Sequence, residues 1–307
     1  MKSKTLLHSF ILIFVAFIWG SSFVAQDTGG NLLGPFFFNG IRSFLACFIL
    51  LPTIKILDFK YYTINKPSSK SDYKKLLFSG ILCGLFLFLA SSFQQLGIYY
   101  KSSVGKAGFL TACYIFIVPI LSYFIGKKCS FNVWISVFIA LIGLYLLCIS
   151  KGFSIAFSDM LLLICSLLFS LQVITIDYFI TEVDGIRLAF IQMFSCAVLS
   201  IIASVIFDMH CSLEGFYKCI NSINSSSAII AILYAGILSS GIGYTLQIVG
   251  QKGLNPTLAS LLMSLESVFS VLAGYVFLNQ VLTSRQIIGC IFMFSAIVLA
   301  QLDFKKK

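Results

Sequence analysis

The sequence has few charged residues and few of the residues that build catalytic and metal sites. Only 10% of its 307 residues are charged, against about 25% in soluble domains. It holds two histidines, and it has no C-x-x-C pair, no H-E-x-x-H and no G-K-[ST] loop. Zinc, redox and nucleotide sites use such patterns. We therefore expect no cofactor, no metal and no catalytic residue, which leaves an intramembrane enzyme as a remote alternative.

Apolar residues make up most of what is present. The chain is 59% hydrophobic, with a mean hydropathy of +1.01. Apolar windows of about 20 residues can cross the hydrocarbon core as helices, because lipid leaves the backbone no other hydrogen-bond partners. The windows are 8–26, 34–57, 75–98, 103–126, 131–150, 158–180, 187–208, 228–250, 255–278 and 285–302. The sequence thus predicts an all-α integral membrane protein with ten transmembrane helices.

Basic residues set the predicted orientation. If the N-terminus is cytoplasmic, 15 lysines and arginines fall on the cytoplasmic side and 5 on the outside, with Arg42 inside a span. Positive charge favours the cytoplasmic side. We therefore expect a multi-pass protein of the cytoplasmic membrane with both termini in the cytoplasm. The net charge of +10 is explained by this topology, so we expect no nucleic-acid partner.

An internal repeat appears when the chain is shifted by 152 residues. The shift aligns identical residues in matching apolar windows, including Gly84 with Gly236 and Gln95 with Gln247. Two halves follow, 8–150 and 158–302. Five helices in each half invert the second half, an architecture in which transporters bind substrate near the midplane and use alternating access. This favours a transporter, as a monomer or weak dimer, over a channel.

The first two windows carry a recognisable motif. Ile18-Trp19-Gly20-Ser21-Ser22-Phe23, then Gly34-Pro35 and Arg42, together with the region around Glu266, resemble the EamA family of the drug/metabolite transporter superfamily. The resemblance implies ten helices in two halves and export of amino acids or other small metabolites. An uncoupled facilitator and a multidrug or cation exporter are the alternatives, because the motif does not specify a substrate.

The sequence departs from the family pattern at two points. The proline that often follows the polar residue of the fourth helix in each half is absent, since Ile115 follows Tyr114 and Ser267 follows Glu266. The sequence therefore lacks the proline that would give a local helix break at these positions, and Pro119 is the candidate for a displaced kink in the first half. The first helix of each half also lacks the central glutamate by which related small multidrug transporters exchange protons, so that coupling is not carried over.

Charged residues at depth in the membrane are the main candidates for function. Glu266 lies near the middle of its window, and the repeat places Tyr114 at the same depth. Charges at such depth usually face the protein interior. Glu266 is expected to contact a cationic substrate group or a proton, or else to pair with a buried base. Arg42 is expected to bind a substrate carboxylate, or else to brace neighbouring helices.

Buried amides and a small-residue stripe complete the predicted site. The residues Gly236, Ser240, Gly243, Gln247 and Gly250 fall on one face of an ideal α-helix, with the glycines suited to packing. Amides in a dry site need partners. The predicted substrate-binding residues are Trp19, Ser22, Arg42, Gln95, Tyr114, Gln247 and Glu266. The expected partners are a small-molecule substrate and the lipid bilayer, with protons as a candidate coupling ion.

Overall fold

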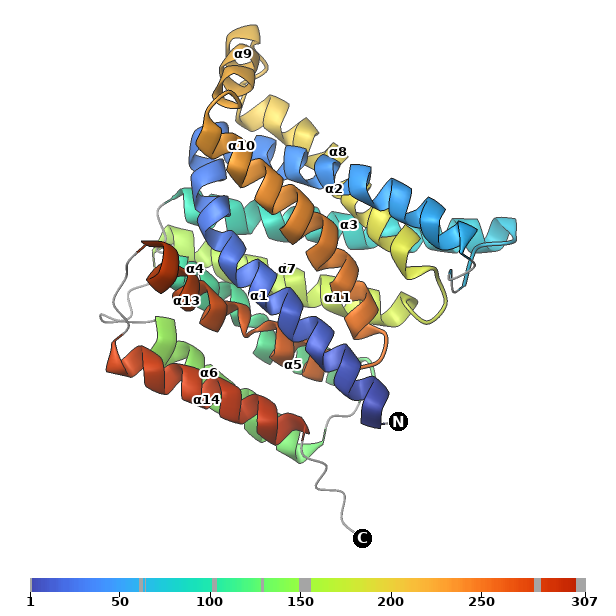
Figure 1. The fold of residues 1–307 in the computed structure, drawn as a ribbon, viewed down its shortest axis with the longest axis vertical. Helices are drawn as coiled ribbons and strands as arrows, with labels where there is room; N and C mark the ends of the chain where they lie inside the picture. Colours follow the sequence, from blue (N-terminus) through green and yellow to red (C-terminus); the bar gives the residue numbers. More distant parts are fainter. Residues whose placement is uncertain are drawn as a thin grey trace.

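A computed structural model describes residues 2–60, 63, 65–100, 104–127, 130–148, 156–278 and 283–301. Every regular element in these ranges is helical (Figure 1). Eight helices are long and apolar enough to cross a membrane, and two shorter apolar helices span Phe131–Leu147 and Ser284–Ala300. The predicted all-α architecture is confirmed, and it is that of an integral membrane protein. The predicted ends of the two halves, at 150 and 302, lie outside the described residues.

The helices follow the predicted windows, with several windows divided into shorter pieces. The first half holds α1 (Lys2–Leu33), α2 (Pro35–Phe59), α3 (Lys70–Tyr99), α4 (Val104–Ala112), α5 (Tyr114–Phe124) and α6 (Phe131–Cys148). The second half holds α7 (Phe157–Phe179), α8 (Gly185–Phe207), α9 (Leu213–Ser222), α10 (Ser226–Leu233), η1 (Tyr234–Gly243), α11 (Tyr244–Gln251), α12 (Pro256–Met263), α13 (Glu266–Leu278) and α14 (Ser284–Gln301). The short helix α9 was not expected from the sequence.

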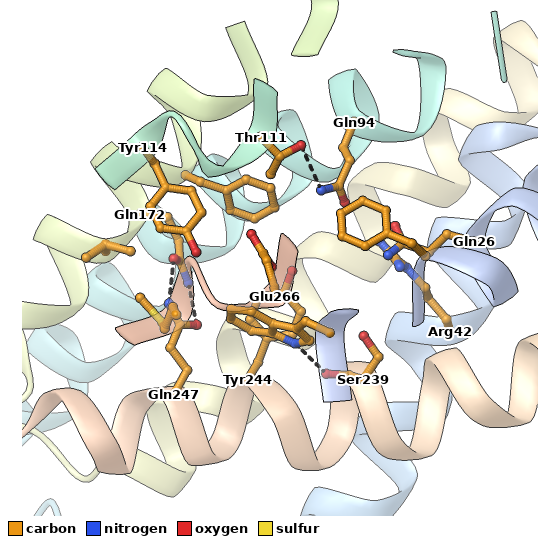
Figure 2. Close-up of a pocket in the computed structure, with 15 residues that line it drawn as sticks. Gln26, Arg42, Gln94, Thr111, Tyr114, Gln172, Ser239, Tyr244, Gln247 and Glu266 are labelled. Carbon is orange, nitrogen blue, oxygen red and sulfur yellow. Dashed lines mark hydrogen bonds between the residues drawn. The ribbon is translucent and has the colours of Figure 1, made fainter. Parts of the chain in front are cut away.

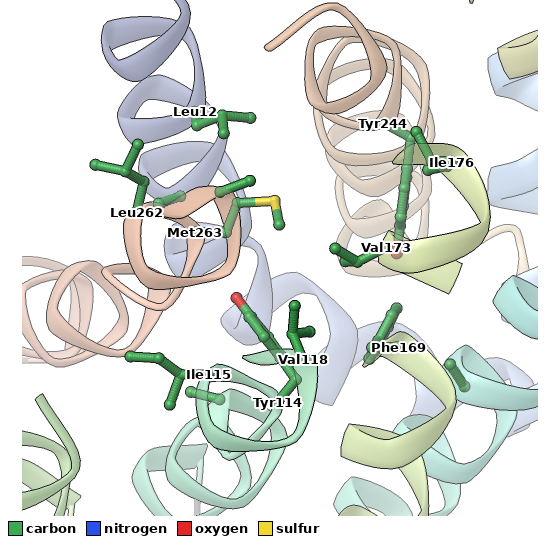
Figure 3. Close-up of a cluster of buried hydrophobic side chains, with 14 of the residues drawn as sticks. Leu12, Tyr114, Ile115, Val118, Phe169, Val173, Ile176, Tyr244, Leu262 and Met263 are labelled. Atoms are coloured by element: carbon green, nitrogen blue, oxygen red, sulfur yellow. The ribbon is translucent and has the colours of Figure 1, made fainter. Parts of the chain in front are cut away.

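Helices from the two halves pack against one another. The most extensive contacts join α6 with α14, α2 with α8, α3 with α7 and α8, and α1 with α13. Figure 1 shows α6 and α14 side by side at one end of the molecule, with α2, α3 and α8 toward the other. The core lies between these groups. Figure 3 shows part of it, contributed by residues such as Leu12, Ile115, Val118, Val173, Ile176, Leu262 and Met263.

Two windows contain a helix break that the sequence did not predict. The first falls at Cys113, between α4 and α5, and the second at residues 264–265, between α12 and α13. At the second break the hydrogen bonds of the helix backbone are tighter than in an α-helix. The Leu265 N–H donates to the Leu262 carbonyl, three residues back, at 3.3 Å. The Ser264 hydroxyl also donates to the Leu261 carbonyl at 2.7 Å. Such serine bonds compete with the helix ladder, and one of them accompanies this break, which forms without proline.

The eighth window is not a uniform α-helix either. Ten of its residues, Tyr234–Gly243, form a π-helix. π-Helices are rare in proteins, but those that occur are often found at functional sites. The predicted single stripe is therefore wrong. A Cβ at Gly236 would meet Leu45 of α2, whereas one at Gly243 would meet Trp19 of α1. The glycines do allow close packing as expected, but the wider turn directs them at different helices.

Ion pairs join helices near their ends. Lys106 of α4 pairs with the buried carboxylate of Asp159 of α7 at 2.5 Å. Lys127, after α5, pairs with Asp177 near the other end of α7. The two pieces of the broken fourth window are thus each held to α7 by a charge.

Asp208 fixes the start of α2. Its Oδ2 accepts hydrogen bonds from the backbone N–H groups of Phe36 at 3.0 Å and Phe37 at 2.7 Å. These N–H groups have no partner within the helix, because they belong to its first turn. Gly34 precedes them with φ of +90°, and a Cβ there would lie 2.8 Å from the Asp208 Cγ. Burial raises the pKa of the Asp208 carboxyl to about 6, although the two N–H donors lower it.

This carboxyl predicts a pH dependence of stability. An unfolded aspartate has a pKa of about 3.9, so between that value and about 6 the folded state binds more protons. The contribution of Asp208 to the free energy of unfolding is therefore largest at low pH and falls as pH rises through this window. We expect Asp208→Asn to remove that part of the slope. Melting temperatures of both proteins in detergent against pH test this, and identical slopes would contradict it.

Candidate functional site

A small cavity lies between the two halves (Figure 2). Its volume is about 30 Å³, enough for a water or two but too small for a metabolite. It is lined by Trp19, Phe23, Gln26, Arg42, Gln94, Thr111, Tyr114, Phe169, Gln172, Val173, Ser239, Tyr244, Gln247, Met263 and Glu266. The lining comes from α1, α2, α3, α4, α5, α7, η1, α11, α12 and α13. This conformation is therefore closed around its centre.

Two opposite charges face this cavity. Arg42 of α2 is 4% exposed, as is Glu266 of α13. Neither forms a salt bridge in the part of the chain that the structure describes. The Arg42 guanidinium lies 5.5 Å from the centre of the Phe38 ring, and Glu266 Oε1 has no hydrogen-bond partner there. Buried charges are costly unless paired, and this cavity holds one basic and one acidic side chain without an ion-pair partner among the described residues.

The helix breaks place Glu266 and Tyr114 at matching positions. Tyr114 is the first residue of α5 and Glu266 the first residue of α13. Figure 2 shows both side chains directed into the cavity from opposite helices. The Tyr114 hydroxyl lies near the Glu266 carboxyl and interacts with it. The breaks thus place both side chains at the start of a helix, where they face the centre of the cavity.

Buried glutamines line one end of the cavity. Gln172 of α7 and Gln247 of α11 exchange two hydrogen bonds, at 3.3 and 3.1 Å. Gln172 also donates to Gln192 of α8 at 3.2 Å. These bonds join three helices, and they leave Gln192 Nε2 without a hydrogen-bond partner among the described residues. A polar substrate atom that displaced one of these amides would have to supply the donor or acceptor that the displaced amide loses.

Trp19 forms part of the wall between α1 and η1. Its Nε1 donates to the Ser239 carbonyl at 3.2 Å, and its ring lies 4.8 Å from that of Tyr244. A Cβ at Gly243 would approach Trp19 Nε1 to 2.6 Å. The glycine and the π-helix thus bring the indole ring to the cavity.

Five of the seven predicted site residues line the cavity, whereas Ser22 and Gln95 lie behind it. Gln26 donates to the Ser22 hydroxyl at 3.1 Å. Gln95 donates to the Gln26 carbonyl at 2.7 Å. Both therefore hold Gln26, whose Oε1 has no partner in the described ranges. Gln95 thus contacts the backbone of Gln26, whereas Ser22 contacts its side chain and also accepts from the hydroxyl of Ser239, another lining residue, at 3.3 Å.

Several lining residues had little or no sequence signal. Gln94, Gln172 and Tyr244 are polar residues within apolar windows, which is the signal that finds them. Thr111, Phe169 and Met263 resemble ordinary core residues. The carbonyl that accepts from Trp19 belongs to Ser239, and the π-helix that positions it leaves no periodic pattern.

Gly20 controls the approach of α1 to α13. A Cβ at this position would lie 2.5 Å from the Glu266 carbonyl oxygen and 2.8 Å from the Ser270 nitrogen. Backbone atoms cannot yield as a side chain does, so we expect Gly20→Ala to destabilise the protein by about 1–3 kcal/mol. Gly108→Ala is the matched control, because its Cβ would meet α13 only at 3.4 Å. Melting temperatures in detergent compare them, and an unchanged Gly20→Ala protein would contradict this packing.

Comparisons with known proteins agree over the whole chain. A model described as the EamA-like transporter family matches residues 7–149 and 156–302. A protein described as an uncharacterized transporter from Archaeoglobus fulgidus is 29% identical over 300 residues, covering 97% of this chain and 87% of that protein. The uncharacterized transporter YoaV of Bacillus subtilis is 22% identical over 301 residues, covering 96% and 97%. A solved crystal structure that is 17% identical matches the fold with a TM-score of 0.75, covering 97% of this chain and 96% of its own.

Proposed function

This chain belongs to the EamA-like transporter family, and from that premise we propose that it exports small zwitterionic metabolites, such as amino acids, through the cavity between its halves. Membrane transport follows from the family. The substrate class, the direction and the mechanism are the proposal. We place the protein in the cytoplasmic membrane with both termini in the cytoplasm, because of the excess of basic residues on that side.

The observation that carries this proposal is the pair of unpaired charges in one cavity. Arg42 offers a planar set of donors suited to a carboxylate. Glu266 offers acceptors suited to an ammonium group, beside the hydroxyl of Tyr114. A zwitterion satisfies both charges at once, whereas a neutral solute leaves them unpaired. The five lining residues among our predicted set therefore bind the substrate, and Ser22 and Gln95 position Gln26.

The pairing of helices supports ten spans in two inverted halves. We count α6 and α14 as spans, and α4–α5, α10–η1–α11 and α12–α13 as one span each. The contact of α3 with α7 then has its counterpart in that of η1–α11 with α1. The contacts α2 with α8 and α6 with α14 join equivalent helices. This pattern is unchanged when the halves are exchanged, as expected for a pseudo-twofold axis.

Alternating access fits a centre that is closed to a metabolite. The cavity of about 30 Å³ must expand for the substrate to enter and leave. Rocking of one half against the other would open it to one side at a time. Lys106 and Lys127 hold the broken fourth span to α7, while no ion pair among the described residues joins α1 with α12 or α13. We propose that the movement occurs between α1 and the α12–α13 span.

A cation exporter is the second candidate. Glu266 lies beside the packed rings of Trp19 and Tyr244, and aromatic faces bind organic cations. Arg42 disfavours this reading, because a cation in the same cavity would be repelled. Transport of amines and of zwitterions separates the two functions.

Uptake into proteoliposomes tests the proposal. A panel of radiolabelled amino acids and of their decarboxylated amines is offered with and without an imposed pH gradient. We expect saturable uptake of at least one amino acid and little uptake of its amine. Acceleration by the gradient would identify protons as the coupling ion, whereas indifference would indicate an uncoupled facilitator. Uptake of amines alone would replace our proposal by the cation exporter.

A further inference from the structure

A long apolar groove lies on the lipid-facing side of α1, away from the central cavity. Its volume is about 880 Å³. Its floor is α1, and its walls are α10 with η1 on one side and α13 on the other. Figure 1 shows α1 running between the orange α10 and the dark red α13.

The sequence of α1 creates this groove. The N-terminal half of α1 carries Phe10, Phe14 and Phe17 on its lipid-facing side, each at least half exposed. This side then continues with Ser21, Ala25 and Thr28, which line the groove. Because the side chains of the floor are small, the groove is deep there, whereas the walls carry large exposed residues such as Ile230 and Val276.

The polar atoms of the floor are already paired. The Ser21 hydroxyl donates to the Phe17 carbonyl at 2.7 Å and lies 2.6 Å from the Tyr234 hydroxyl. The Thr28 hydroxyl donates to the Val24 carbonyl at 3.0 Å. The floor thus offers no free group to recognise a polar solute, and the groove suits an apolar occupant.

The length of the groove matches one leaflet. It extends along α1 from Phe17 to Thr28, which is about 16 Å at the rise of an α-helix, or half of the roughly 30 Å hydrocarbon core. At its inner end the rings of Phe17 and Phe269 pack edge to face, 5.4 Å apart. At its outer end it reaches Ser227 in the first turn of α10.

We propose that this groove binds one acyl chain of an outer-leaflet phospholipid as an ordered ligand. The methyl end of the chain lies against Phe17 and Phe269, and the headgroup lies near Ser227. The assignment to the outer leaflet rests on the proposed orientation. The occupant is a lipid rather than a soluble molecule, because the floor and walls belong to apolar helices long enough to cross the membrane and the groove opens to their lipid-facing side.

The site also has a consequence for transport. One face of α1 forms the floor of the groove and the opposite face carries Trp19 and Gln26 of the cavity. A chain packed between α10 and α13 would hold α1 in its place between them. The bound lipid thus stabilises the closed conformation.

Native mass spectrometry of the detergent-purified protein tests the site with Ala25→Phe, which fills the floor. We expect the wild type to retain one phospholipid and the variant to retain about tenfold less, because a large side chain in a packed site is poorly tolerated. Ile291→Phe, on an exposed part of α14, is the matched control and should retain the lipid. Equal retention by all three proteins would overturn the proposal. A wild-type dimer without lipid that Ala25→Phe dissociates would also overturn it, in favour of a second copy of this chain.

A second variant keeps the test decisive if Ala25→Phe does not fold. Leu238→Trp places an indole at the inner end of the groove wall. The tryptophan fluorescence of the wild type is subtracted from that of each variant. We expect lipids brominated near the methyl end to quench the fluorescence of Leu238→Trp at a lower mole fraction than that of Ile291→Trp. Equal quenching curves at the two positions would mean ordinary surrounding lipid and would contradict an ordered site.

Discussion

Glu266→Gln is expected to lower kcat/KM for a zwitterionic substrate by about 100-fold, since removing one partner of a buried charge pair costs about 2–5 kcal/mol. The amide keeps the size of the side chain but loses the charge that attracts an ammonium group. The carboxylic acid analogue of the same substrate, which lacks that group, should be transported no worse by the variant than by the wild type. Initial rates in proteoliposomes measure both effects.

Glu182→Gln provides the matched control. Glu182 pairs with Lys75 at the surface, where both side chains are nearly half exposed. Exposed ion pairs contribute less than about 1 kcal/mol, so this variant should transport at nearly the wild-type rate. If Glu266→Gln also transported the zwitterion at the wild-type rate, the glutamate would have a structural role only.

Arg42→Gln is expected to lower kcat/KM for the zwitterion by a similar factor of about 100, while uptake of the decarboxylated amine rises. The guanidinium attracts the substrate carboxylate and repels amines, and both effects vanish with its charge. Arg285→Gln is the control, because Arg285 packs on Tyr145, 5.1 Å from the ring centre, and does not line the cavity.

The alternative for Arg42 is that it braces helices. It lies over the Phe38 ring of its own helix, and its loss would then lower the melting temperature. Transport of every substrate would fall in parallel, with no change in preference between amine and zwitterion. The selectivity shift is therefore the measurement that separates binding from bracing.

The sequence predicts much of this molecule because lipid imposes strong constraints. A span must be helical and apolar, so windows such as 34–57 and 158–180 correspond closely to α2 and α7. A charge at depth must face the interior, so Arg42 and Glu266 were found as candidates and both line one cavity.

The remainder depends on local backbone geometry that has no periodic signal. Serine bonds, rather than proline, accompany the break before Glu266. The π-helix redirects Gly236 and Gly243 to different neighbours. Ser22 and Gln95 were placed on the cavity by helical spacing and depth alone. Close packing of α1 against its neighbours puts them one layer behind Gln26.

Equilibrium binding tests the central claim most directly. An amino acid that is taken up, its amine and its carboxylic acid are each titrated into purified wild-type, Arg42→Gln and Glu266→Gln proteins. We predict that the wild type prefers the amino acid, that Arg42→Gln loses the preference for the amino acid over the amine, and that Glu266→Gln loses the preference for the amino acid over the acid. If both variants bound all three ligands more weakly by the same factor, Arg42 and Glu266 would not recognise the two ends of a zwitterion, and the proposed site would be wrong.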